Sequence, residues 1–272
     1  MQKWSLNRKR VGQRIGLVPT MGYLHQGHMS LVQLAHERTE VVVASIFVNP
    51  IQFLPGEDLA HYPRDFERDE RLCREAGVTA VFYPTPEEIY AADHSVYVDE
   101  TLLSKGLCGR QRPGHFRGVA TVVAKLFNLV LPDVAVFGQK DAQQSRIIQR
   151  LVRDLNFPVE IVVGPIVREP DGLAMSSRNR YLSAQERQHA LSLHRALEQA
   201  EDLYRRGCRD VPVIREALEA CLSVESAVKI EFIELVDNST LEPVTTMGGA
   251  VLIALAARVG STRLIDNIVL GA

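Results

Sequence analysis

Hydrophobic runs alternate with amphipathic stretches through residues 1–167 of the chain. Continuous apolar runs are typical of strands buried on both faces, and we predict strands at Arg14–Pro19, Glu40–Val48, Ala80–Tyr83, Asp133–Phe137 and Val159–Val167. Apolar positions at helical spacing predict helices at His28–Arg38, Asp65–Ala76, Gly118–Leu131 and Ala142–Leu155. This alternation predicts the α/β class, with a Rossmann-like parallel sheet that carries helices on both faces.

The pattern changes after Val167. A polar stretch that contains Pro170 and Gly172, REPDGLAMSSRNRYLS, is typical of a loop. Ser183 then begins S-A-Q-E, a capping-box sequence that predicts a helix from this point to about Arg206. The remaining pattern predicts one more helix, Val211–Leu222, and three strands, at Val228–Val236, Ala250–Ala256 and Leu264–Leu270. We therefore predict two domains, residues 1–167 and a smaller C-terminal α+β domain of residues 168–272.

The composition argues against several classes of protein but does not indicate a reaction. The 272 residues are 46% hydrophobic and 24% charged, with a formal charge of −2, so no bulk attraction to nucleic acid or to a membrane surface is expected. No apolar run approaches the roughly 20 residues that span a bilayer, and no signal peptide is recognisable. The four cysteines lack C-x-x-C spacing, which predicts reduced thiols in a cytoplasmic protein rather than a zinc site or redox pair.

The stretch VPTMGYLHQGHMSLV carries the first candidate chemistry, because it places two histidines where a predicted strand gives way to a helix. His25 and His28 are three residues apart and share one face of a helical turn. A helix N-terminus attracts anions, and two imidazoles beside it would donate hydrogen bonds to a polyphosphate. Gly22 and Gly27 would let a ligand approach the backbone closely. The alternative is a pair of surface histidines on a first helical turn.

A second candidate segment lies in the polar loop after Val167. The sequence AMSSRN offers two hydroxyl groups and the guanidinium of Arg178 to phosphate oxygens. Alone, such a segment is more often a solvated linker. H-x-G-H at a strand-to-helix turn resembles the nucleotidylyltransferase superfamily, in which a downstream loop of this kind closes on a nucleotide.

Three further motifs narrow the resemblance. They are SIFVNPIQF (residues 45–53), RPGHFRGVATVVAKLFN (112–128) and VFGQKDAQQ (136–144). Together with PTMGYLHQGH and DGLAMSSRN, and in the same order along nearly the whole chain, they closely resemble the pantothenate synthetase (pantoate–β-alanine ligase) family. The resemblance implies an ATP-dependent acid–amine ligase of pantothenate and coenzyme A biosynthesis. Such an enzyme condenses pantoate with β-alanine through pantoyl adenylate, and releases pyrophosphate and AMP.

The resemblance also implies roles for individual residues. His28, His25 and Lys140 would act in catalysis, and Gln52 and Gln144 would bind pantoate, with Gln52 also reaching β-alanine. ATP would contact Met21, Gly22, Tyr23, Leu24, His25, Gln26, Gly27, His28, Gly138, Gln139, Lys140, Asp141, Val167, Met175, Ser176, Ser177 and Arg178. Mg²⁺ would accompany ATP as co-substrate, with Asp69 as a candidate ligand and no tightly bound organic cofactor. The resemblance further implies a homodimer, and the C-terminal domain would act as a lid.

The chain departs from the family pattern at three of these places. Gln139 stands where the family commonly has Glu, Ala142 replaces a common aromatic residue, and Arg68 interrupts the acidic stretch around Asp69. His115 fits either pyrophosphate binding or the ordering of a loop. Two other functions remain open from the sequence. One is a different nucleotidylyltransferase that leaves the nucleotide on its product, and the other is a nucleotide-binding module without catalysis.

Overall fold

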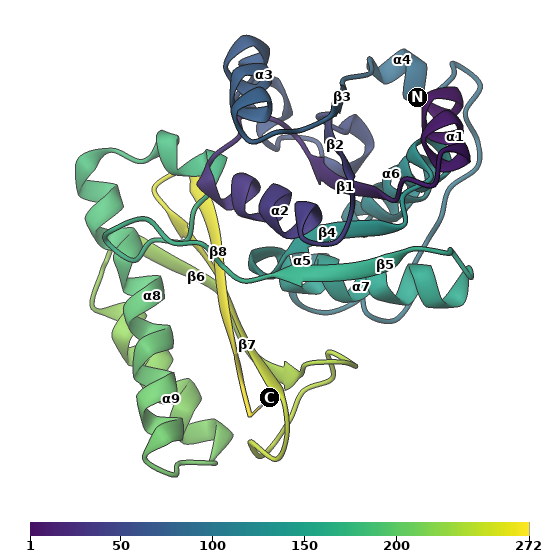
Figure 1. Ribbon diagram of the computed structural model, residues 1–272. Coiled ribbons are helices and arrows are strands. Elements are labelled where there is room, and N and C mark those ends of the chain that lie inside the picture. Colours follow the sequence, from purple (N-terminus) through teal and green to yellow (C-terminus); the bar gives the residue numbers. More distant parts are fainter. Residues whose placement is uncertain (272) are drawn as a thin grey trace. The chain divides into compact units, whose positions relative to one another are not determined.

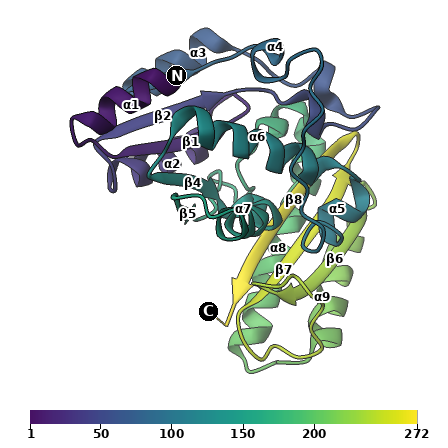
Figure 2. The ribbon, with the colours of Figure 1, turned by 90° about the vertical axis from the view of Figure 1, so that its right-hand side faces the viewer.

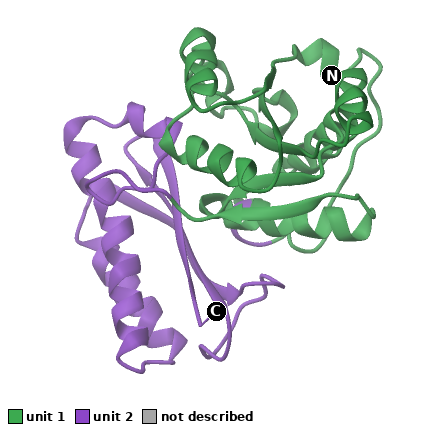
Figure 3. Cartoon of the chain, in the orientation of Figure 1, with its two compact units in different colours: residues 1–105, 109–166 green, residues 106–108, 167–272 purple. Residues whose placement is uncertain are grey.

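The structure, a computed structural model, describes residues 1–271 and contains two compact units (Figure 3). Unit 1 consists of Met1–Lys105 and Gly109–Ile166, and unit 2 consists of Gly106–Cys108 and the chain from Val167 onward. The predicted domains of residues 1–167 and 168–272 stay a prediction.

Unit 1 is built on a five-stranded sheet, as the apolar runs predict. The strands are β1 (Ile15–Thr20), β2 (Val41–Ile46), β3 (Ala80–Phe82), β4 (Val134–Gly138) and β5 (Glu160–Gly164). Their order is β3-β2-β1-β4-β5, and every neighbouring pair is parallel. From β1 the chain adds β2 and β3 on one side of the sheet and then β4 and β5 on the other, so the strand order switches between β1 and β4. Ligands of open α/β sheets bind beyond the carboxyl ends of the strands at such a switch point.

Helices cover both faces of this sheet (Figures 1 and 2). The unit contains α1 (Gln2–Arg10), α2 (Gln26–His36), α3 (Phe66–Glu75), α4 (Pro86–Ile89), α6 (His115–Val130) and α7 (Ala142–Asp154). The short helix α5 (Leu107–Gln111) begins in the part of the chain assigned to unit 2 and ends in unit 1. Leu31, Val32 and Ala35 of α2 pack on Val18 and Val134 of the sheet. α7 packs on β4 and β5, and α6 packs on α1 and α7.

Unit 2 contains an antiparallel sheet and two long helices (Figure 1). Strands β6 (Val228–Asp237), β7 (Val251–Val259) and β8 (Thr262–Leu270) pair in that order, and α8 (Ala184–Arg205) and α9 (Val211–Ser223) contribute to the same hydrophobic core. The expected capping box is present. Ser183 accepts from the Glu186 N–H at 3.2 Å, and the Glu186 carboxylate accepts from the Ser183 N–H at 2.8 Å. The smaller α+β unit thus forms as predicted.

The short elements are the ones that the pattern did not predict. α1 has the sequence QKWSLNRKR and buries only Ser5, so it carries no apolar stripe to detect. α4 spans only Pro86–Ile89, although Thr85 and Glu88 close a capping box around it. The fifth strand is shorter than expected and ends at Gly164, because Pro165 follows and cannot donate to the ladder. Among residues 1–271, no helix is both long and apolar enough to cross a membrane.

Candidate active site

The loop after β1 is held by a carboxylate from α3. Gly22 and Tyr23 have positive φ angles of +83° and +49°, so the chain turns sharply before α2. Asp69 accepts from the Tyr23 N–H at 2.6 Å and from the Leu24 N–H at 2.8 Å. Arg68 approaches Asp69 at 3.4 Å and lies over the Tyr23 ring. These contacts fix the backbone that leads into the histidine pair, and Leu24 itself is a core side chain.

The two histidines meet at the N-terminus of α2. His25 is the N-cap residue, His28 lies three residues later, and their ring centroids are 4.0 Å apart. The His25 N–H donates to His28 Nδ1 at 3.2 Å, so a neutral His28 carries its proton on Nε2. Loss of hydration on burial, together with the positive charges of His25 and Lys140, lowers the pKa of His28 well below its ordinary value. His28 is therefore a neutral hydrogen-bond donor at neutral pH.

Lys140 lies just beyond β4, the strand that neighbours β1 in the sheet. It follows Gly138, the last residue of β4, in a short 3-10 turn of Gln139–Asp141. β1 and β4 are neighbours, so the histidine motif and this turn stand at the carboxyl ends of adjacent strands. The Lys140 ammonium lies 3.9 Å from the Asp141 carboxylate and is close enough to His28 to lower its pKa. The arrangement offers one cation and one neutral donor to a phosphate group.

Gln52 is the predicted substrate residue with the most contacts. It is buried at the end of a 3-10 turn, Pro50–Gln52, that follows β2. Its Oε1 accepts from Asn49 Nδ2 at 3.0 Å, and its Nε2 points to Met21 Sδ at 3.0 Å. Asn49 in turn accepts from the Tyr90 hydroxyl at 2.8 Å.

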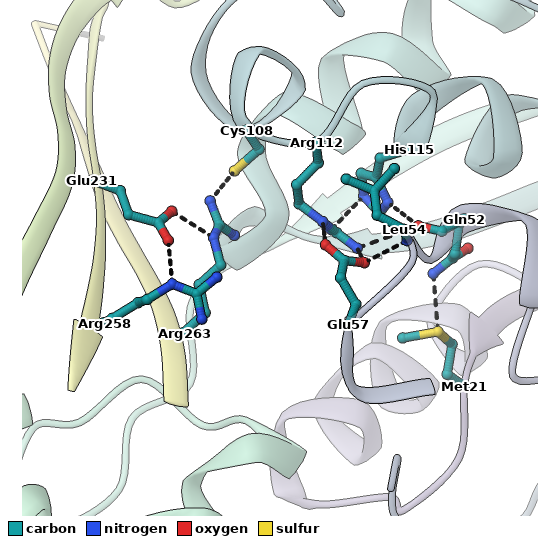
Figure 4. A network of polar contacts seen from close by, with 10 residues as sticks. All are labelled: Met21, Gln52, Leu54, Glu57, Cys108, Arg112, His115, Glu231, Arg258 and Arg263. Carbon is teal, nitrogen blue, oxygen red and sulfur yellow. Dashed lines mark hydrogen bonds and ion pairs between the residues drawn. The ribbon is translucent and has the colours of Figure 1, made fainter. Parts of the chain in front are cut away.

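The backbone of Gln52 is held by the first residue of α6 and by the segment just before that helix, as Figure 4 shows. The carbonyl oxygen of Gln52 accepts from His115 Nδ1 at 2.8 Å and from Arg112 at 3.3 Å. Glu57 binds the Arg112 guanidinium through both oxygens, at 2.6 and 2.7 Å. Burial and the positive charge of Arg112 lower the pKa of His115 to about 4. Burial acts to raise the pKa of Glu57, but the hydrogen bonds from Arg112 and the Leu54 N–H outweigh it, and the pKa is lowered.

The other site residues predicted in unit 1 are described by the helices that carry them. Gln144 lies half-buried in the first turn of α7. Its neighbour Gln143 is buried and donates to the Leu103 carbonyl at 2.8 Å, so Gln143 braces a loop. Gln26 and Gly27 lie in the first turn of α2 beside the histidines.

The carboxylate of Asp69 is 1% exposed, and both of its oxygens accept backbone N–H groups. Burial raises its pKa despite these hydrogen bonds. Within residues 1–271, no three His, Cys, Asp or Glu side chains are arranged to hold a metal ion. A metal role for Asp69 thus gains no support from its surroundings and stays a prediction.

The AMSSRN segment lies in unit 2. Ser176 caps a 3-10 helix of Ser177–Tyr181 and accepts from the Arg178 N–H at 3.2 Å. The Val167 carbonyl accepts from the Met175 N–H at 3.0 Å. Asn179, the last residue of this segment, donates to Glu169 at 2.7 Å, so the segment is anchored to its own unit.

Sequence reasoning missed three residues around Gln52. Tyr90, Glu57 and Arg112 were given no role from the sequence, because they are 38, 5 and 60 positions from Gln52 and no local spacing links them to it. Of the two roles left open for His115, its hydrogen bond to Gln52 matches the ordering of a loop.

Comparison with known proteins gives one consistent result. The family model described as pantoate-beta-alanine ligase matches residues 1–269. The pantothenate synthetase of Thermotoga petrophila is 58% identical over 271 residues, which cover 100% of this chain and 97% of that protein. That of Heliobacterium modesticaldum is 55% identical, with 99% and 96% covered.

Solved structures agree with the sequence comparison. The crystal structure of pantothenate synthetase from Thermus thermophilus has a TM-score of 0.92 at 47% identity and covers 94% of this chain and 92% of its own. Pantoate-beta-alanine ligase from Francisella tularensis, complexed with beta-gamma ATP and beta-alanine, has a TM-score of 0.80 at 32% identity, with 98% and 94% covered.

Proposed function

Since the chain belongs to the pantoate–β-alanine ligase family, we propose that it condenses pantoate with β-alanine at the expense of ATP in pantothenate biosynthesis. The observation that carries this proposal is the family match over residues 1–269. The neutral His28 beside Lys140 is an independent feature that suits phosphate chemistry.

The proposed reaction has two steps. A pantoate carboxylate oxygen attacks the α-phosphorus of ATP, a P–O bond breaks, and pyrophosphate leaves pantoyl adenylate behind. The β-alanine amine then attacks the acyl carbon, loses a proton and displaces AMP. We propose that His28 Nε2–H and Lys140 bind the phosphoryl oxygens whose charge grows in the first step, with His25 as their partner. Catalysis is mainly the positioning of two bound reactants.

The substrate roles extend the proposal to other residues. Gln52 and Gln144 would hydrogen-bond pantoate, and Gln52 would also contact β-alanine. The backbone from Met21 to His28 and the turn from Gly138 to Asp141 would bind the nucleotide. In unit 2, Val167 would contact adenine, and Met175, Ser176, Ser177 and Arg178 would bind the triphosphate. An acyl adenylate hydrolyses readily, so unit 2 would exclude water as a lid until the amine arrives.

Magnesium enters the proposal as part of the ATP substrate. Mg²⁺ keeps several waters and binds substrate phosphates with one or two carboxylates, so it does not need a cage of protein ligands. Asp69 already accepts two backbone N–H groups, which favours coordination mainly by phosphate and water. No tightly bound organic cofactor is part of the proposal.

We also propose a homodimer, on the family resemblance, and a cytoplasmic location. Sedimentation at micromolar concentration would show a species of about twice 30.3 kDa, and a monomer would contradict the dimer.

The test is pyrophosphate release from ATP and Mg²⁺, with and without pantoate, before β-alanine is added. A burst that requires pantoate, followed by AMP release when β-alanine is added, is the expected result. Pyrophosphate release that requires a different acceptor would favour another nucleotidylyltransferase. ATP binding without turnover would leave a nucleotide-binding module.

A further inference from the structure

The side-chain amide of Gln52 has a defined orientation of its oxygen and its nitrogen, and neighbouring residues set that orientation. Asparagine and glutamine amides offer an acceptor and a donor that are nearly identical in shape, so their orientation has to be derived from the partners. Three side chains form a chain of hydrogen bonds here: Tyr90 to Asn49 at 2.8 Å, and Asn49 to Gln52 at 3.0 Å.

A backbone carbonyl sets the direction of this chain. The Gly118 carbonyl oxygen accepts a hydrogen bond from Asn49 Nδ2 at 3.1 Å, and a carbonyl oxygen can only accept. Asn49 must therefore turn its NH₂ group toward Gly118 and its Oδ1 toward Tyr90. The second N–H of Asn49 then donates to Gln52 Oε1. Gln52 is left with its NH₂ group pointing away, toward Met21 Sδ, which is a weak acceptor.

Tyr90 supplies the proton that Asn49 Oδ1 requires. Its ring is held near Phe47, with centroids 6.2 Å apart, and near His94, at 4.9 Å. Burial, and then the nearby Tyr97, raise the pKa of Tyr90, so its hydroxyl keeps its proton throughout the physiological range. Without that hydroxyl, Asn49 Oδ1 would be a buried acceptor that has lost its donor, and such groups are costly.

From this geometry we propose that Tyr90 is a positioning residue, which acts through Asn49 to make Gln52 a hydrogen-bond donor to the substrate. A donor at this position favours a group that only accepts, such as a carboxylate, over one that must donate. The inference rests on the proposed function, because the carboxylate in question is that of pantoate. Arg112 and His115 complete the arrangement by holding the carbonyl of the same residue.

The first test is Tyr90→Phe, which keeps the ring and removes the hydroxyl. We expect the KM for pantoate in the pyrophosphate assay to rise about 5- to 50-fold, as loss of one buried hydrogen bond predicts. The KM for ATP should stay within about twofold. Tyr97→Phe is the matched control, because Tyr97 also contacts His94 but the residue is 39% exposed and its ring lies against Arg117. An unchanged pantoate KM in Tyr90→Phe would overturn the proposal.

The second test asks whether Tyr90 acts through Gln52. In a double-mutant cycle with Gln52→Ala, Tyr90→Phe should change the pantoate KM by less than about twofold when Gln52 is already absent. A merely structural role of Tyr90 would instead make the two factors multiply, and that result would reject the relay.

A third variant tests the donor polarity without disturbing Tyr90. Gln52→Glu still offers an oxygen to Asn49 but presents a carboxylate oxygen where the NH₂ group stood. We expect its pantoate KM to exceed that of Gln52→Ala. A pantoate KM equal to or below that of the wild type would show that Gln52 accepts rather than donates. Wild-type protein that shows no pantoate-dependent pyrophosphate release would contradict the proposed function itself, so the two failures are distinguishable.

Discussion

At the scale of single residues, His28 combines a defined proton position with a defined charge. The His25 N–H donates to His28 Nδ1, and burial, followed by nearby positive charge, lowers the pKa of His28 so that the ring stays neutral. A neutral imidazole that donates from Nε2 would stabilise a phosphoryl oxygen, as proposed above, without repelling the Lys140 ammonium. The tautomer follows from an adjacent backbone group, so it is a local property of the strand-to-helix turn.

We expect His28→Ala to keep the fold and to lower turnover by about 10²–10³, the usual loss when one transition-state donor is removed. The measurement is the rate of pantoate-dependent pyrophosphate release at saturating ATP. His189→Ala is the control, because it removes a histidine that pairs with Glu225 in unit 2. Turnover close to that of the wild type would exclude His28 from the mechanism.

The same scale shows what a sequence reveals about a site. The histidine pair could be predicted, because three-residue spacing at a helix start brings side chains together in any helix. The partners of Asp69 could not, since its carboxylate binds backbone N–H groups 45 and 46 positions away. The family resemblance made Asp69 a candidate metal ligand, which stays a prediction, and only the tertiary fold reveals that its carboxylate also braces the loop before His25.

At the scale of elements, long helices and buried strands were predictable because their apolar faces are periodic. α2 and α8 form where the pattern places them, with small differences at the ends. α1 escaped prediction because its sequence lacks an apolar stripe and its stability comes from contacts with β1 and α6. The pattern thus locates the strands and helices that frame the site, and the strand ends that Gln52 and Lys140 follow, but not the 3-10 conformation of the turns that carry them.

The close approach of α6 to the turn that carries Gln52 yields a prediction about Gly118. A Cβ atom there would lie 2.5 Å from the Ile51 carbonyl oxygen and 2.7 Å from Gln52 Cα, both of them backbone atoms. Ala is better than Gly in a helix by about 1 kcal/mol, but this gain does not remove the clash.

We therefore expect Gly118→Ala to displace the turn and to raise the pantoate KM by tenfold or more. Gly249→Ala is the control, because a Cβ at that position meets no atom within 4 Å. Steady-state kinetics of the two variants decide the matter. Equal pantoate KM values for both would show that the turn tolerates the displacement.

At the scale of the whole molecule, buried neutral histidines link stability to pH. The pKa of His115 is about 4 in the folded protein, below its ordinary value of 6.5, and the pKa of His28 is lowered as well. For His115, at pH values between about 4 and 6.5, the unfolded chain binds more protons than the folded one. The free energy of unfolding therefore falls as the pH falls below about 6.5. The loss ends once the pH drops below the folded pKa. For His115 it amounts to roughly 3 kcal/mol at most.

His115→Asn tests this linkage, because its amide nitrogen retains a donor for the Gln52 carbonyl but does not titrate. We expect the variant to be less stable than the wild type at pH 7.5, where it has lost the contact between His115 and Arg112, and to lose less stability on going to pH 4.5. Urea unfolding followed by the fluorescence of Trp4 suits the measurement, since this single tryptophan lies in α1 and so belongs, like His115, to unit 1. Parallel pH dependences in the two proteins would show that His115 is not the titrating group, and would leave His28 and the carboxylates to account for any loss.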